Sequence, residues 1–180
     1  MDQAKNLPNT DYETVYALEK EKAEFEKDMG WFGKYCFPKA LAKDTPPFHR
    51  DIYKQLKSDD TRRVLIAAPR GTAKSTVCSL IFPMYKIAYK KPEDDLFMVI
   101  VSESQAQSVN FLSRIKYHLE HSQNFKDIFG DFSSTTAKRW TGADIVLKNG
   151  TRIVAVGTGQ RVRGFIEGDT RPNVIIVDDF

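Results

Sequence analysis

The chain has 180 residues, of which 41% are hydrophobic and 28% are charged, proportions that are ordinary for a globular protein with one substantial core. No apolar run is long enough to cross a bilayer, and the polar, acidic N-terminus does not match a signal peptide. Cys36 and Cys78 are the only cysteines. Two distant cysteines argue against a disulfide framework or a zinc site and favour a reducing compartment.

The net charge of +3 is unevenly distributed along the sequence. Residues 1–30 contain eight acidic and four basic side chains, whereas residues 138–171 contain seven basic and three acidic ones. Such asymmetry is typical of a protein with a polyanionic partner. A solvated basic surface is the alternative interpretation.

The N-terminal part, residues 1–45, is predicted to be a helical and irregular segment in front of one domain, residues 46–180. Apolar spacing predicts a charged helix from Asp11 to Lys27 that leans on the outside of the domain, with a partner-binding arm as the alternative. The glycine-interrupted aromatic stretch 30–38 is predicted to be irregular. A helix from Pro46 to about Leu56 then opens the domain, because proline is tolerated in a first helical turn.

The next stretch predicts a phosphate-binding loop. Val64 to Ala67 reads as a short buried strand, and small residues lead from it to Lys74-Ser75-Thr76. A helix, kinked at Pro83, is expected from Lys74 to about Tyr89. In such a loop backbone N–H groups approach phosphate oxygens, the lysine neutralises the β- and γ-phosphates, and the serine hydroxyl holds Mg²⁺.

The loop departs from the usual glycine pattern, since Ala68 and Ala73 occupy the two glycine positions and Gly71 is its only glycine. A plain strand–turn–helix joint is therefore the alternative. The apolar run 174–177 ends in Asp178 and Asp179, which is typical of a buried parallel strand that presents a Mg²⁺-holding aspartate at its carboxyl end. A strand ending in a solvated acidic turn is the alternative. Together the two motifs predict nucleotide binding.

The residues between these motifs predict an α/β fold with a mainly parallel sheet. A buried strand is expected over 96–101, followed by a helix that Ser104 and Gln107 cap. His118 and His121 near its end are interpreted as a solvated helix terminus rather than a metal site. Asn-Gly at 149–150 predicts a hairpin between strands 144–147 and 151–156, before a glycine-rich basic loop, 157–164.

Three segments together resemble the large terminase subunit of tailed bacteriophages, the DNA-packaging motor. They are residues 69–76, the Arg161-Val162-Arg163-Gly164 loop and residues 171–179, and Pro47-Phe48-His49 also fits the pattern. The likeness extends from about Phe48 to Phe180. It implies a P-loop NTPase of the RecA-like additional-strand class, with a mainly parallel sheet flanked by helices.

The resemblance also implies a function and partners. It implies an ATPase that uses ATP and Mg²⁺ to drive double-stranded DNA into a procapsid, in the cytoplasm of an infected host cell. The implied partners are duplex DNA, a portal protein, a small terminase subunit and further copies in a ring, with no membrane. The alternatives are a helicase-like P-loop remodeller and a non-catalytic DNA- or portal-binding module with a degenerate phosphate loop.

The resemblance assigns roles to individual residues. Lys74 would bind the β/γ-phosphates, Arg70 would lie beside the γ-phosphate and Asp179 would polarise water, although many family members have glutamate there. Ser75 and Asp178 would hold the metal. The nucleotide-binding set is Pro69, Arg70, Gly71, Thr72, Ala73, Lys74, Ser75 and Thr76.

Two further expectations follow from the resemblance. His49 lies near the position of an adenine-reading glutamine in related ATPases, but imidazole lacks the paired donor and acceptor of an amide. We therefore expect His49 to pack beside the site. The resemblance further implies that these residues are the front of a longer protein, because a coupling motif and a nuclease domain follow in the family. We accordingly expect slow or no ATP hydrolysis by residues 1–180 alone.

Overall fold

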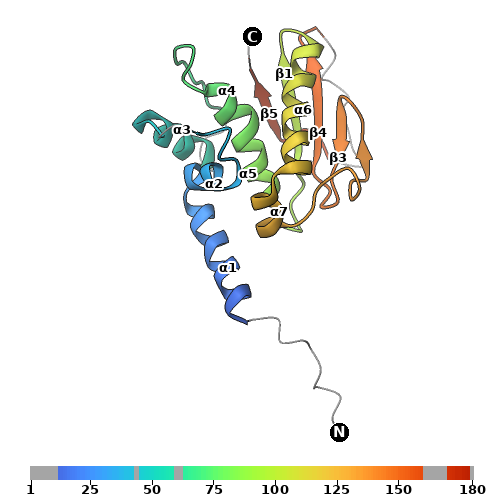
Figure 1. Cartoon of the computed structure of the whole chain (residues 1–180). Helices are drawn as coiled ribbons and strands as arrows, with labels where there is room; N and C mark the ends of the chain where they lie inside the picture. Colours follow the sequence, from blue (N-terminus) through green and yellow to red (C-terminus); the bar gives the residue numbers. More distant parts are fainter. Residues whose placement is uncertain (1–11, 43–44, 59–62, 160–169, 179–180) are drawn as a thin grey trace.

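The computed structural model describes residues 12–42, 45–58, 63–159 and 170–178 (Figure 1). Helical segments predominate in the first half of this part of the chain, and most of the strands follow in the second half. The helical segments are α1 (Tyr12–Lys27), α2 (Met29–Cys36), α3 (Pro47–Lys57), α4 (Lys74–Thr76), the π-helix η1 (Val77–Ile81), α5 (Phe82–Ala88), α6 (Gln105–His121) and α7 (Gln123–Phe129). The strands are β1 (Phe97–Ser102), β2 (Arg139–Trp140), β3 (Asp144–Val146), β4 (Arg152–Gly157) and β5 (Val174–Val177).

The five strands form one mixed sheet in the order β2-β3-β4-β1-β5. Strand β1 pairs in parallel with both β4 and β5, while the β2–β3 and β3–β4 pairs are antiparallel. The α/β class is therefore confirmed, but the expectation of a mainly parallel sheet is wrong. The physical reason is the predicted hairpin itself, since Gly150, at φ +82°, makes the tight turn that reverses the chain between β3 and β4.

The main core lies between one face of the sheet and the helices. Alternate residues of β1 and β4, such as Met98, Ile100 and Ile153, are fully buried there with Leu80 of η1 and Leu112 of α6. The other face of these strands carries a smaller apolar cluster of Phe97, Val99, Val154 and Val156. Both faces of β1 and β4 are thus apolar, as the continuous hydrophobic run of residues 96–101 predicts.

Most predicted elements are confirmed, with small shifts at their ends. The capping of α6 is seen directly, because the Ser104 hydroxyl oxygen accepts from the Gln107 N–H at 3.3 Å. Helix α3 begins with Pro47 in its first turn, as expected. His118, by contrast, is not a solvated residue: its ring packs edge-on against Phe37 at 4.9 Å.

Residues 29–36 form helix α2, so the expectation of an irregular segment is wrong. Asp28 starts this helix, since its Oδ1 accepts from the N–H groups of Gly30 at 2.8 Å and Trp31 at 3.0 Å. The glycines serve close packing: a Cβ on Gly30 would lie 2.8 Å from Tyr53 Cε2, and one on Gly33 would lie 2.8 Å from Leu41 Cδ1. The two glycines therefore do not interrupt the helix; they let neighbouring side chains pack closely against it.

The predicted strand over 64–67 is not formed. Residues 63–69 have no regular secondary structure, and Leu65 is 95% exposed. A strand requires a neighbour to satisfy its backbone groups, and these residues pair with no strand within the described part of the chain. Strand β5 is parallel, as predicted, but it lies at the sheet edge and is not fully buried, because Ile175 and Val177 are 57% and 55% exposed.

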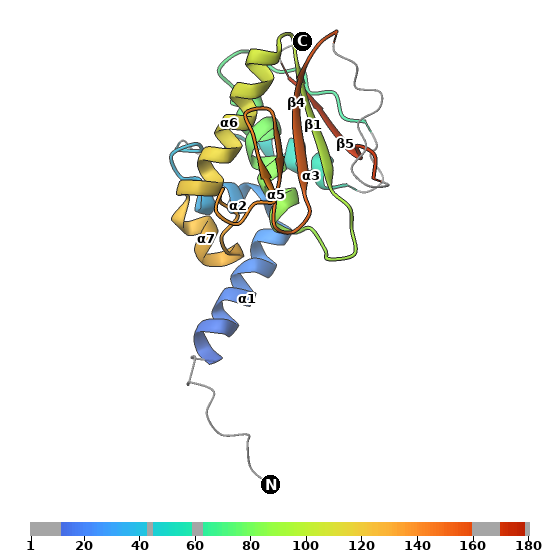
Figure 2. The same cartoon turned by 90° about the vertical axis from the view of Figure 1, so that its right-hand side faces the viewer.

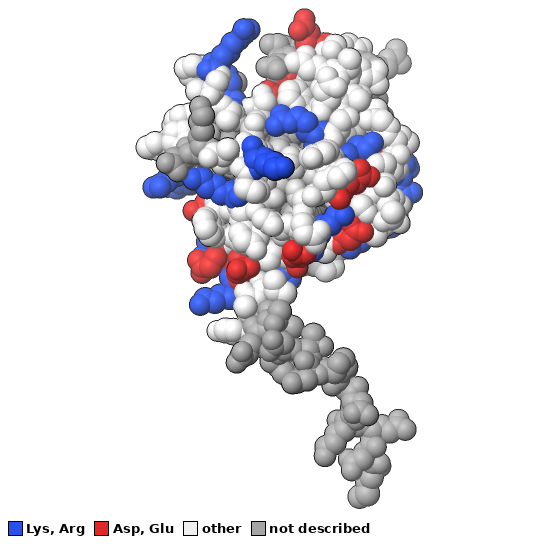
Figure 3. Space-filling model, in the orientation of Figure 1, with Lys and Arg blue, Asp and Glu red and all other residues white. Residues whose placement is uncertain are grey.

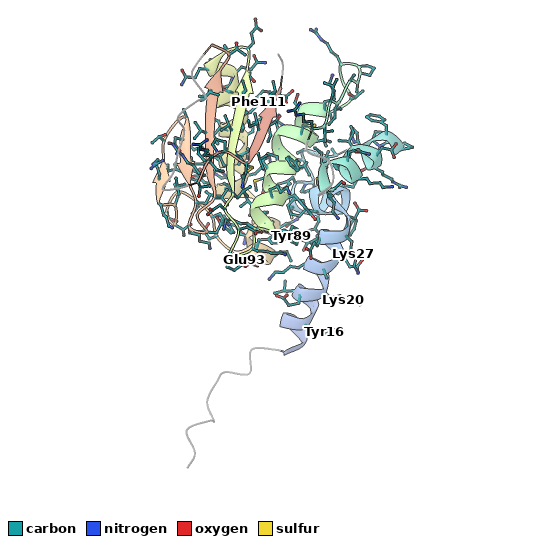
Figure 4. All side chains as sticks on the ribbon, turned by 180° about the vertical axis from the view of Figure 1, so that it is seen from behind. Tyr16, Lys20, Lys27, Tyr89, Glu93 and Phe111 are labelled. Carbon is teal, nitrogen blue, oxygen red and sulfur yellow. The ribbon has the colours of Figure 1, made fainter. Side chains whose placement is uncertain are left out.

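Helix α1 extends away from the rest of the molecule (Figures 1 and 2), and Leu18 and Phe25 pack it against the core. Phe25 is buried there, and the hydroxyls of Tyr85 and Tyr89 donate to the carbonyls of Glu26 at 2.6 Å and Lys22 at 2.8 Å. Figure 4 shows Tyr16 on the outer part of α1 and Lys27 where α1 meets the body. Among the described residues, no helix combines the length and apolar character that spanning a membrane requires.

Candidate functional site

The loop before α4 is a tight turn that contains two left-handed residues. Gly71 has φ +80° and Ala73 has φ +58°; the first is easy for glycine, whereas the second strains an alanine. The Thr72 hydroxyl donates to the Pro69 carbonyl at 2.7 Å and closes the turn. The left-handed Ala73 explains why this position usually holds glycine in phosphate loops.

Lys74 reaches back across the loop that precedes it. Its ammonium donates to the Ala68 carbonyl, so the side chain connects the beginning and the end of the loop. Pro69, Arg70 and Gly71 at the loop's tip are exposed. The loop thus presents backbone and one fixed cation at the start of the continuous helical run α4–η1–α5, the end of a helix that favours anions.

A carboxylate from the far end of the chain meets this helix. Asp178, directly after β5, accepts from the Ser75 hydroxyl through Oδ1 at 3.1 Å and from the Ser79 hydroxyl through Oδ2. Its backbone is also fixed, because its N–H donates to the Val101 carbonyl at 3.0 Å and its carbonyl accepts from the Ser102 hydroxyl at 2.7 Å. The structure therefore brings together the two sequence motifs.

Ser79 was missed by the sequence reasoning. It is buried within η1, and its spacing of four residues from Ser75 places both hydroxyls on one side of the helix. A serine at that spacing inside an apolar helix was the available signal. The π-helical turns precede Pro83, which lacks the N–H that an α-helix would pair with the Ser79 carbonyl. The predicted disturbance at Pro83 thus takes the form of a widened helix.

His49 holds the loop from the other side. It is 4% exposed, and its Nε2–H donates to the Thr72 carbonyl at 2.7 Å. Its ring also packs against Phe48 and Tyr53 of the same helix, at centroid distances of 4.6 and 6.1 Å. His49 therefore packs beside the loop, as expected, and connects α3 to it.

Two basic side chains lie near the loop. Arg70 is exposed at its tip. Arg114 of α6 donates from Nη2 to the Thr76 hydroxyl at 3.4 Å, a long contact that sequence reasoning did not anticipate. Asp179, Arg161 and Arg163 lie outside the described residues, so the roles given to them stay predictions.

The Cys78 thiol reports the electrostatics of this region. Its pKa is raised to about 11, chiefly by burial and also by the negative charge of Asp178, against the lowering effect of the Lys74 ammonium. The thiol is therefore protonated and unreactive at neutral pH. The Asp178 carboxylate and the Lys74 ammonium thus both lie close enough to Cys78 to affect its pKa.

The donor set suits a Mg²⁺ ion that takes most of its ligands from elsewhere. In the described ranges, no group of three or more His, Cys, Asp or Glu side chains could hold a metal ion. Ser75 and Asp178 instead offer one hydroxyl and one carboxylate within hydrogen-bonding distance of each other. Mg²⁺ is commonly bound by one or two such oxygens together with water and substrate phosphates.

No protein-family model matches the sequence, and no curated protein matches it. The functional interpretation therefore depends on the geometry of the loop, its lysine and the Ser75–Asp178–Ser79 contacts.

Proposed function

We propose that the chain binds Mg²⁺–ATP at residues 69–76 and Asp178. The observation that carries this proposal is the contact of Asp178 with Ser75 across 103 residues of sequence. A chance Lys-Ser after a turn would not require a strand-terminal carboxylate beside it. Asp178 follows the carboxyl end of β5, which pairs in parallel with β1. Ligands of open α/β sheets bind at the carboxyl ends of the strands.

The side chains present have distinct tasks in this proposal. Lys74 carries the positive charge that offsets the β- and γ-phosphates, and the exposed loop offers N–H groups to their oxygens. Ser75 and Asp178 would hold Mg²⁺, which neutralises charge on the phosphates when bound. Ser79 keeps the Asp178 carboxylate oriented. Arg70, at the exposed loop tip, is proposed to act beside the γ-phosphate.

We further propose that this nucleotide site belongs to a terminase-like ATPase that moves double-stranded DNA. The support is the order of three motifs, 69–76, 161–164 and 171–179, and the excess of basic residues over 138–171. DNA packaging into a procapsid, with a portal protein, a small subunit and a ring of copies, is the function those motifs favour.

One set of observations favours a non-catalytic DNA- or portal-binding module instead. Residues 63–69 form no strand, and Ala73 takes a strained left-handed conformation where glycine would be unstrained. A loop that had lost nucleotide binding would tolerate both features. Nucleotide binding by the chain decides between the two candidates.

The experiment is a titration of the chain with a fluorescent ATP analogue, with and without Mg²⁺. We expect Mg²⁺-dependent binding that Lys74→Ala abolishes and Ser75→Ala makes insensitive to Mg²⁺. Lys91→Ala, which removes an exposed charge elsewhere, is the matched control. Equal binding by the Lys74→Ala variant and the control, with both folded by circular dichroism, would contradict the proposal.

A further inference from the structure

A second site lies between the end of α1, the start of α2 and one side of α3. A cavity of about 450 Å³ is lined there by Lys27, Asp28, Met29, Arg50, Tyr53, Lys54, Lys57 and Ser58. An adjoining cavity of about 320 Å³ shares three of these residues, Asp28, Arg50 and Tyr53. We call the two together the α3 pocket. Figure 3 shows Lys and Arg atoms gathered over this side of the molecule.

The α3 pocket is strongly basic. Four lysine and arginine side chains line the larger cavity against a single carboxylate, Asp28. That carboxylate already caps α2, because its Oδ1 accepts from the Gly30 and Trp31 N–H groups. Lys27 is paired with Glu24 at 2.9 Å, so Arg50, Lys54 and Lys57 leave an excess of positive charge over the one carboxylate that lines the pocket.

The basic residues form one stripe along α3. Arg50, Lys54 and Lys57 are spaced by four and three residues, so they lie on the same face of the helix. Like charges at this spacing repel each other and destabilise a helix. Lys57 is compensated, since its ammonium donates to the Glu26 carbonyl and, at 2.7 Å, to the Lys27 carbonyl.

Arg50 and Lys54 have no such compensation. Both are exposed, and neither forms a hydrogen bond or ion pair with a described residue. Arg50 lines both cavities, and its planar guanidinium can bind two oxygens of one anion at once. A phosphate group suits these donors better than a monatomic anion does, because it offers several oxygens to donors that converge on it.

We propose that the α3 pocket binds a phosphate-bearing anion, through Arg50 and Lys54 with Lys57 adding positive charge, whereas the Lys27 ammonium is paired with Glu24 at 2.9 Å. Its volume is that of a small-ligand site. The bound phosphate comes either from a free anion or from a nucleic-acid backbone, which share this chemistry. The pocket is separate from the phosphate loop, to which α3 is connected by the His49–Thr72 hydrogen bond.

The test uses the chain with Lys74→Ala, so that the phosphate loop contributes least. Backbone amide shifts are followed by NMR during titration with pyrophosphate in one arm and with a short DNA duplex in the other. The variants compared are Arg50→Ala/Lys54→Ala and the matched control Lys20→Ala/Lys91→Ala, which removes two exposed charges that line neither cavity. Circular dichroism and thermal melting confirm that each variant is folded.

We expect at least one probe to shift the amides of residues 27–30 and 50–57. Removing Arg50 and Lys54 should weaken that binding by about tenfold or more, since a charge-assisted hydrogen bond contributes about 1.5–3 kcal/mol. Binding of pyrophosphate would identify a site for a free anion. Binding of the duplex alone would identify a site for the nucleic-acid backbone, and the affinity of the Arg50→Ala/Lys54→Ala variant for the duplex should then depend less steeply on salt concentration. The proposal is overturned if neither probe shifts these amides, or if both double variants bind equally. The chain used for this test carries Lys74→Ala, so failure of the phosphate loop to bind ATP would not change the outcome at the α3 pocket.

Discussion

Removing the Ser79 hydroxyl tests whether the Asp178 carboxylate is held as the structure shows. Ser79 is buried, and it donates to Asp178 Oδ2 while Ser75 donates to Oδ1 at 3.1 Å. A hydrogen bond to a charged group contributes about 1.5–3 kcal/mol. We expect Ser79→Ala to lower the free energy of unfolding by that amount, because one carboxylate oxygen loses its donor in a partly buried position.

A double-mutant cycle isolates this contact from the rest of the helix. Unfolding by urea is measured for the parent chain, Ser79→Ala, Asp178→Asn and the double variant. The coupling free energy should be about 1–3 kcal/mol, since the two residues share one charge-assisted hydrogen bond. The matched cycle pairs Asp178→Asn with Ser108→Ala, whose hydroxyl bonds within its own helix α6. A Ser79–Asp178 coupling no larger than that of the matched pair would refute the assembled site.

Three further variants test local features. Tyr53→Phe should raise the free energy of unfolding by about 1 kcal/mol in urea titrations, because its buried hydroxyl has no hydrogen-bond partner among the described residues. A loss of stability would show that a partner exists. Ala73→Gly should leave stability unchanged or raise it by about 0.5–1 kcal/mol, since glycine relieves the left-handed strain, and a clear loss in the same assay would exclude that conformation. Burial, Arg114 and His121 lower the pKa of His118 from 6.5 to about 4. The native state therefore binds this proton less readily than the unfolded state, and stability should fall as pH drops from 6.5 towards 4. His118→Gln should flatten that fall, and an unchanged pH profile would contradict the burial of the ring.

The features that local chemistry determines were predictable from the sequence. Ser104 before an apolar-periodic run identified the start of α6, and Asn149-Gly150 identified the turn between β3 and β4. The run of apolar residues at 97–101 likewise identified β1. Each of these signals lies within a few residues of the structure that it predicts.

The wrong predictions concern non-local contacts. Residues 64–67 have the composition of a strand, but a strand exists only beside another strand, and the sequence does not show which neighbour is present. The Gly30 and Gly33 positions suggested a break in structure, whereas the ring of Tyr53 and the side chain of Leu41 approach them closely. The edge position of β5 depends on sheet order, which hydrophobicity does not specify.

The main residues of the candidate site were predictable from the sequence, but the residues that hold them in place were not. Lys74, Ser75 and Asp178 were chosen from motif order, and the structure places Ser75 and Asp178 in contact. Ser79 and the His49 contact with the loop carbonyl emerged only from the fold. Ala73 adopts a strained left-handed conformation, which the sequence could not reveal.

Hydrogen exchange with and without Mg²⁺ and a slowly hydrolysed ATP analogue tests the proposed nucleotide site most directly. We expect slower exchange of amides in residues 70–77 and at Asp178 when both ligands are present, with no such change in Lys74→Ala. Lys91→Ala should behave as the parent chain does. Unchanged exchange over both segments of the parent chain, or the same protection in the Lys74→Ala variant, would contradict nucleotide binding at this loop.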